Sequence, residues 1–142
     1  MTDVAAYGTQ LKLGDGASPE VFTVIAQVTS IGGPNLEMDA LDVTAHDSTA
    51  GWREFIGGLL SGGEVSLEIN YDPVGGTHDA STGLIAELEG RTISNYQLVF
   101  PDAATTTWEF TALVTRFSPS APVADKLTAS ITLQVSGQPT LV

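Results

Sequence analysis

Two stretches of the chain alternate strictly between apolar and polar side chains. Residues 64–71 read EVSLEINY and residues 126–136 read KLTASITLQVS, so every second side chain in each stretch is apolar. A period of two is typical of strands with one buried and one solvent-facing side, as in antiparallel sheets. In residues 14–16 the letters GDG tolerate positive φ and predict a hairpin turn. Weaker strand patterns occur in residues 10–13, 21–29, 95–100 and 107–117.

One helix is predicted, over about residues 79–89. Asp79 or Ser81 is a candidate cap, and Gly90 is a stop signal. The apolar stripe of this helix consists of Leu84, Ile85 and Leu88. The strand patterns predict a mainly β fold. A short helix with one apolar stripe is best buried against a sheet, so we expect this helix to lie on the sheet. The predicted architecture is an antiparallel β-sandwich or flattened barrel with one flanking α-helix and a long β–β loop.

The long loop, residues 31–63, shows no sustained period of either kind. Loops longer than roughly 12–15 residues are uncommon in compact domains and are usually functional or disordered. This one carries large apolar side chains, namely Trp52, Phe55, Ile56, Leu59 and Leu60. We expect them to be buried against another surface, such as a second copy of the chain. The alternative is a loop that folds back onto its own sheet.

Composition is that of a folded domain. The chain has 142 residues, of which 42% are hydrophobic and 15% charged, and we expect a single domain over residues 1–142. It contains no apolar run long enough to cross a membrane. Cysteine is absent, which excludes disulfides and thiolate metal sites.

The charge balance is strongly acidic, with 17 acids against five bases and a formal net charge of −12. Proteins that bind nucleic acid obtain most of their affinity from cationic contacts to phosphate. The sequence therefore excludes an ordinary nucleic-acid-binding protein. A plain solubility role for the acidity is the alternative to a functional one.

His46, Asp47 and Ser48 are consecutive and have the residue types of a hydrolase triad. Triad members converge from separated positions, whereas consecutive residues in an extended segment point to alternating sides. A turn in which the oxygens of Asp47 and Ser48 accept hydrogen bonds from nearby backbone N–H groups is the better interpretation. We predict no catalytic residue and no enzyme activity.

Metal and phosphate sites are not indicated either. His46 and His78 lack the spacing of a zinc pair, and Asp39, Asp42 and Asp47 do not match a calcium-binding loop. The glycine pairs of the long loop lack the lysine of a phosphate loop. The sequence predicts no metal and no cofactor.

Three segments together resemble a known family. They are GTQLKLGDG (residues 8–16), DVTAHDSTAGWREFIGGLLSGGEVSLEINYDP (residues 42–73) and FPDAATTTWEFTALVTRFSPSAPVADKLTASITLQVSGQPTL (residues 100–141). In order and over nearly the whole chain, these look like the major tail tube protein of long-tailed, non-contractile, lambda-like bacteriophages. Similar proteins occur in prophages and gene transfer agents. The sequence ends after this domain, so we expect no C-terminal immunoglobulin-like domain of the kind that some members carry.

The resemblance implies a structural virion protein that is made and assembled in the host cytoplasm. Six copies would join edge to edge into a ring, and rings would stack into a hollow tail tube through which DNA passes without adhering. Besides itself, the implied partners are the tape measure, tail terminator and distal tail proteins, with no membrane binding. An alternative is a related component of the same fold, such as the inner tube of a contractile system or a tail-completion protein.

Two sets of site residues follow from this interpretation. The predicted lumen-lining set is the polar side of two strands: Glu64, Ser66, Glu68, Asn70, Thr128, Ser130, Thr132 and Gln134. The alternative is that this side faces outside solvent. The predicted inter-ring and inter-subunit set lies in the long loop and consists of Asp42, Asp47, Trp52, Arg53, Phe55, Ile56, Leu59 and Leu60.

Overall fold

Nine strands and one short helix form the framework of the computed structural model, which describes residues 3–142. The helix is α1 (Leu84–Glu89). The strands are β1 (Gln10–Gly14), β2 (Phe22–Val24), β3 (Val28–Gly32), β4 (Glu37–Asp42), β5 (Phe55–Ser61), β6 (Glu64–Asn70), β7 (Ile93–Val99), β8 (Thr107–Ser120) and β9 (Thr128–Leu141). Among the residues described, no helix is long and apolar enough to cross a membrane.

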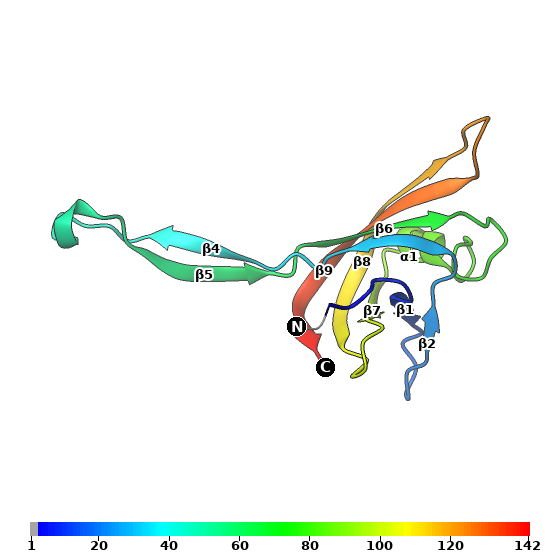
Figure 1. The fold of residues 1–142 in the computed structure, drawn as a ribbon, viewed down its shortest axis with the longest axis horizontal. Helices are drawn as coiled ribbons and strands as arrows, with labels where there is room; N and C mark the ends of the chain where they lie inside the picture. Colours follow the sequence, from blue (N-terminus) through cyan, green and yellow to red (C-terminus); the bar gives the residue numbers. More distant parts are fainter. Residues whose placement is uncertain (1–2) are drawn as a thin grey trace.

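Seven strands form one antiparallel sheet in the order β2-β1-β7-β8-β9-β6-β3. Strand β1, next to one edge, comes within 8 Å of β3 at the other edge, so the sheet curls into a flattened barrel. Strands β4 and β5 form a separate two-stranded ribbon, which extends away from the body (Figure 1). The predicted fold class, mainly β and antiparallel with one flanking helix, is confirmed.

The core lies inside the curled sheet, and the alternation in the sequence locates it correctly. In β6, Val65, Leu67 and Ile69 are buried, while the polar residues between them face solvent. Strand β9 repeats the pattern over its first half. The buried side chains of β1, β6, β7, β8 and β9 pack with Leu84 of α1 into one cluster. This burial is the main favourable contribution to folding.

The predicted helix is shorter than expected. Residues 79–83 form turns, and only Leu84–Glu89 is helical, with Gly83 at the N-cap position. The carboxylate of Asp79 accepts hydrogen bonds from the N–H groups of Ser81, Thr82 and Gly83. Asp79 therefore stabilises the turn that precedes the helix, because its side-chain oxygen accepts hydrogen bonds from backbone N–H groups of this turn.

The predicted strand over residues 21–29 is also wrong in detail, since β2 and β3 are separate. Between them Gln27 has φ +57, a left-handed conformation that ends a strand. His78 holds this junction and is fully buried. Its Nε2 lies 2.7 Å from the carbonyl oxygen of Ala26, and the N–H of Asp72 donates to its Nδ1 at 3.1 Å. His78 thus ties edge strand β3 to the exit of β6.

Residues 31–63 are not an irregular loop. Strand β3 extends to Gly32, and the segment then forms an antiparallel ribbon of β4 and β5 with a short 3-10 turn, Thr49–Gly51, near its tip. We call residues 33–63 the arm. Both sides of the ribbon carry exposed side chains, so its sequence has no apolar and polar alternation that would have revealed two strands. The alternative of a loop folded onto its own sheet is wrong, because the arm projects from the body (Figure 1).

Candidate functional site

The arm exposes an unusual amount of apolar surface. Trp52 is 74% exposed, Leu59 82% and Leu60 78%. Half of the large apolar side chains that the described chain leaves exposed belong to the arm: Leu36, Met38, Leu41, Val43, Trp52, Phe55, Ile56, Leu59 and Leu60. Exposed patches of this extent mark interaction sites on soluble proteins. All eight predicted loop residues lie on this arm and are exposed, including Asp42, Asp47 and Arg53.

Cross-strand pairs place apolar side chains on both sides of the ribbon. Met38 pairs with Leu60 on one side, and Leu41 pairs with Ile56 on the other. The register shifts between Met38 and Ala40, opposite Gly58 and Leu59, and such a bulge increases the local twist. Exposed apolar side chains on both sides, beside the acids of β4, suit the ribbon to insertion between other surfaces.

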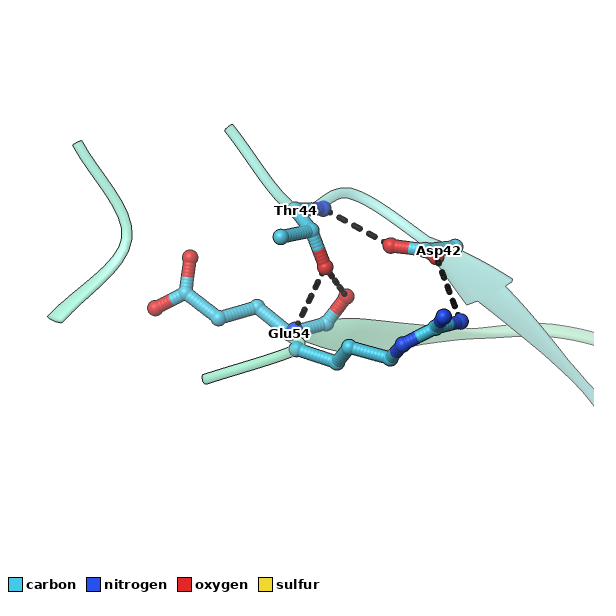
Figure 2. Close-up of polar contacts among 4 residues, drawn as sticks. Asp42, Thr44 and Glu54 are labelled. Carbon is cyan, nitrogen blue, oxygen red and sulfur yellow. Dashed lines mark hydrogen bonds and ion pairs between the residues drawn. The ribbon is translucent and has the colours of Figure 1, made fainter. Parts of the chain in front are cut away.

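Hydrogen bonds hold the ribbon together near its tip (Figure 2). The N–H of Thr44 donates to Oδ1 of Asp42 at 2.9 Å, and the N–H of Glu54 donates to Oγ1 of Thr44 at 2.8 Å. The hydroxyl and N–H of Thr44 hold the pKa of Asp42 below its usual range. Asp42 also lies 3.8 Å from Nη1 of Arg53, but both side chains are exposed and the pair is weak.

The three consecutive triad-like residues sit at this tip. The N–H of Ala45 donates to Oγ of Ser48 at 2.9 Å, and that hydroxyl donates to Oε2 of Glu54 at 2.7 Å. The turn role predicted for Ser48 is confirmed. The same role predicted for Asp47 is wrong, because no hydrogen bond to the Asp47 carboxylate is found among the described residues. No hydrogen bond joins His46 to Ser48 among residues 3–142, and the arrangement is not that of a catalytic relay.

The second predicted set comes together on the solvent-facing side of β6 and β9. Its members form four cross-strand pairs: Glu64 with Gln134, Ser66 with Thr132, Glu68 with Ser130, and Asn70 with Thr128. Four of these side chains are exposed, namely Glu64, Ser66, Glu68 and Ser130, and the other four are partly shielded. At one end of the two strands, Nε2 of Gln134 donates to the carbonyl oxygen of Gly63 at 3.0 Å. At the other end, Oδ1 of Asn70 is buried, and no hydrogen-bond partner for it is found among the described residues.

Sequence reasoning missed that this polar surface is four strands wide. Ser30 of β3 pairs with Glu68, which pairs with Ser130, which pairs with Ser118 of β8. The next row runs from Gly32 through Ser66 and Thr132 to Arg116. We call this solvent-facing side of β3, β6, β9 and residues 115–120 of β8 the polar face. Arg116 is the one base in these rows, and its Nε donates to Oγ of Ser118 at 3.2 Å.

Both sides of the polar face end in unpaired strand edges. Strand β3 is the last strand of the sheet, and among residues 3–142 it pairs only with β6. On the opposite side, β7 pairs with residues 107–113 of β8, so within the described chain residues 115–120 pair only with β9. Free edges present rows of N–H and C=O groups that can pair with another chain. The extension of β8 from its predicted end at residue 117 to Ser120 lengthens one of these edges.

No grouping of three or more histidine and carboxylate side chains among the described residues is arranged to hold a metal ion. The arm and the polar face with its two edges are the features that this fold presents for function. The exposed apolar side chains of the arm and the free strand edges beside the polar face are suited to contact with other chains.

Comparisons with known proteins agree with an assembly role. A sequence model of the lambda phage tail tube protein, TTP, matches residues 6–142. No curated protein sequence matches the chain significantly.

Solved structures give matching folds. A protein in the virion of a native gene transfer agent (GTA) particle superposes with a TM-score of 0.77 at 16% identity, over 99% of both chains. A protein from the tail of an empty GTA particle with C6 symmetry gives 0.75 at 20% identity, over 97% of this chain and 99% of that one. A protein of the sheath–tube complex of PVC, an extracellular contractile injection system in its extended state, gives 0.69 at 16%, over 99% and 91%. At these identities the likeness concerns the fold.

Proposed function

This chain belongs to the lambda phage tail tube protein family, and we propose that six copies join into a ring and that stacked rings form the hollow tube for genome delivery. The number six comes from the C6 symmetry of a GTA tail whose protein has a similar fold. The observation that carries the proposal is the pair of free strand edges that flank one polar face.

The two edges suit a closed ring. Strands β8, β9, β6 and β3 alternate in direction, so the β3 edge of one copy meets residues 115–120 of the next copy in antiparallel orientation. Different edges on each copy make a head-to-tail contact, and such contacts close into rings when the rotation allows it. Closure would also remove edges that are an aggregation hazard in a free monomer.

The polar face would then line the lumen. Apart from Arg116, its rows contain hydroxyl, amide and carboxylate groups, with Glu64 and Glu68 on β6. DNA carries one negative charge per about 1.7 Å of its axis, so this wall offers few cations to hold it. At physiological salt the repulsion extends only about 8 Å, which limits it to DNA near the wall. DNA that is not held can slide.

The arm would join successive rings. Its nine large apolar side chains are each more than two-fifths exposed. They represent on the order of 1,000 Å² of surface, comparable with the ~800 Å² that each partner buries in a standard protein interface. Since the arm projects beyond the body (Figure 1), it can reach a copy outside its own ring.

The tape measure, tail terminator and distal tail proteins are the further partners that we propose for this tube, at its lumen and its two ends. A second candidate function is the inner tube of a contractile system. The likeness to a protein of the PVC sheath–tube complex favours it. A sheath protein that binds the outside of the assembled tube would separate this candidate from a bare tail tube.

Electron microscopy of the purified chain, combined with sedimentation at rising concentration, tests the proposal. We expect hollow tubes with six-fold end views and a sharp critical concentration. Isolated rings at all concentrations would favour a tail-completion protein. A monomer that persists at high concentration would contradict the proposed function.

A further inference from the structure

A groove of about 730 Å³ has residues 28–31 of β3 as one wall. Its other walls are the segment before β1, residues 4–9, and the loop that follows β7. Apolar side chains dominate the lining: Val4, Tyr7, Val28, Ile31, Phe100 and Pro101. Val4 is 57% exposed and Tyr7 95% exposed. The groove is therefore an apolar surface that the monomer leaves uncovered.

Asp102 is the one charged side chain among the lining residues. Its Oδ1 accepts a hydrogen bond from the N–H of Thr106 at 2.7 Å, and its Oδ2 accepts one from the hydroxyl of Thr106 at 2.6 Å. Both hydrogen bonds lower the pKa of Asp102, and the bond from the Thr106 hydroxyl has the larger effect. Each carboxylate oxygen keeps a second lone pair, so Asp102 can also accept from a cation.

The tip of the arm has the complementary composition. Trp52 and Phe55 are exposed aromatic side chains, and Arg53 between them is the one base in residues 33–63. The side chain of Arg53 is 78% exposed, and its contact with Asp42 is long at 3.8 Å. Arg53 can leave that pair at little cost, because exposed ion pairs contribute little to stability.

A second hollow of similar size, about 740 Å³, lies between the β1–β2 loop and the segment before α1. It is lined by four carboxylates, those of Asp15, Glu20, Asp72 and Glu87. The arm carries five acids, Glu37, Asp39, Asp42, Asp47 and Glu54, against its single base. Like charges would repel the arm from this hollow, whereas the groove offers one carboxylate in an apolar setting.

We propose that the groove receives the arm tip of a second copy, with Trp52 and Phe55 against its apolar walls and Arg53 paired with Asp102. The inference rests on the proposed function, in which the arm joins one ring to the next. The donor is another copy because each arm extends away from its own body (Figure 1). Aromatic and arginine side chains are the residues that most often dominate the energy of such contacts.

Cross-linking between subunits tests the location directly, since the natural chain has no cysteine. One variant carries Thr49→Cys at the arm tip and another carries Ala5→Cys in the groove. Tubes assembled from the mixture and treated with a short bismaleimide are expected to yield the mixed dimer. As a matched control, Ser81→Cys replaces Ala5→Cys at an exposed site outside the groove. Tubes that link Thr49→Cys to Ser81→Cys instead would overturn the inference.

A double-mutant cycle tests the ion pair. Arg53→Met and Asp102→Asn are each expected to raise the critical concentration for assembly about tenfold, and the double variant also about tenfold. Glu89→Gln, at an exposed acid on α1 outside the groove and the arm, serves as the control partner, and its effect is expected to be small and independent of Arg53→Met. A double variant whose effect approaches a hundredfold would contradict the pairing of Arg53 with Asp102. If tubes form normally but both tests fail, only the docking of the arm tip in the groove is refuted. If the unmodified chain forms no tubes, the proposed function is refuted as well.

Discussion

Gly63 stands where the arm returns to the body. Its φ is +68, and a Cβ built there would collide with the carbonyl oxygen of Asn35, in the segment that leads out to β4. Its own carbonyl oxygen accepts hydrogen bonds from the N–H of Val135 and from Nε2 of Gln134, each at 3.0 Å. A residue without a side chain therefore allows both strands of the arm to leave the body side by side.

Gly63→Ala is expected to destabilise the folded monomer more than Gly137→Ala does. Gly137 also has positive φ, +81, but a Cβ there meets nothing within 4 Å. The control should lose about 1 kcal/mol for the backbone alone, and Gly63→Ala about 3 kcal/mol because the collision adds to it. Urea unfolding of both variants below the critical concentration measures the difference. Equal losses would show that the arm base tolerates a side chain.

Asp79 provides the second test at this scale, through pH. The backbone N–H of Thr82 is the largest of several hydrogen-bond donors that hold the pKa of Asp79 below its ordinary value of 3.8. The unfolded chain then binds the proton more readily than the native chain. The contribution of Asp79 is complete above pH ~4 and is lost as the pH falls through its lowered native pKa.

Asp79→Asn should therefore lower the free energy of unfolding at pH 7 and flatten its decline below pH ~4. Asp47→Asn is the matched control, because no hydrogen bond to the Asp47 carboxylate is found in the described part of the chain. Acid unfolding followed by circular dichroism measures both. If the two variants gave the same pH profile, the hydrogen bonds of Asp79 would not contribute as described.

Among the elements, the arm decides whether the chain can polymerise. Trp52→Ala combined with Phe55→Ala should leave the melting temperature nearly unchanged, since both side chains are exposed. The same variant should fail to form tubes at concentrations where the natural chain does, because a few buried aromatic side chains carry most of an interface's energy. Sedimentation and microscopy provide the readouts.

The control for that variant is Val74→Ala combined with Val123→Ala, two apolar side chains of the body that are at least as exposed. It should assemble normally. Normal tubes from the arm variant, or failure of the control, would show that apolar contact by the arm is not what joins the rings.

The elements also show how far sequence alone reaches. The alternation in β6 and β9 predicted the core and grouped the polar face correctly, because burial on one side imposes a period of two. The strands of the arm could not be predicted, since nothing in the described part of the chain buries either side of β4 or β5. The break between β2 and β3 depends on the backbone conformation of Gln27, and the short α1 depends on the hydrogen bonds of Asp79. The apolar and polar pattern of the sequence contains no signal for either. The free edge of residues 115–120 and the groove arise from tertiary pairing.

At the scale of the whole molecule, the net charge of −12 has a consequence for the lumen. If the polar face lines the tube, Glu68→Lys adds a cation to the wall in every copy. Tubes should still assemble, because Glu68 lies in mid-strand away from both free edges. Genome release from particles built with this variant should be slower, since each added cation can bind phosphate.

Glu89→Lys gives the same change of charge on the exposed end of α1, away from the polar face. Release from those particles should proceed at the natural rate. Slow release with Glu89→Lys and normal release with Glu68→Lys would mean that the polar face lies outside the tube.

The most direct test of the central claim is a helical reconstruction of tubes grown from the purified chain by electron cryomicroscopy. Six copies per ring are expected, with β3 of each copy hydrogen-bonded to residues 115–120 of the next copy and with Glu64 and Glu68 facing the channel. The arm of each copy should contact the adjacent ring. A channel lined by another surface, or rings that join without these two edges, would contradict the proposed assembly.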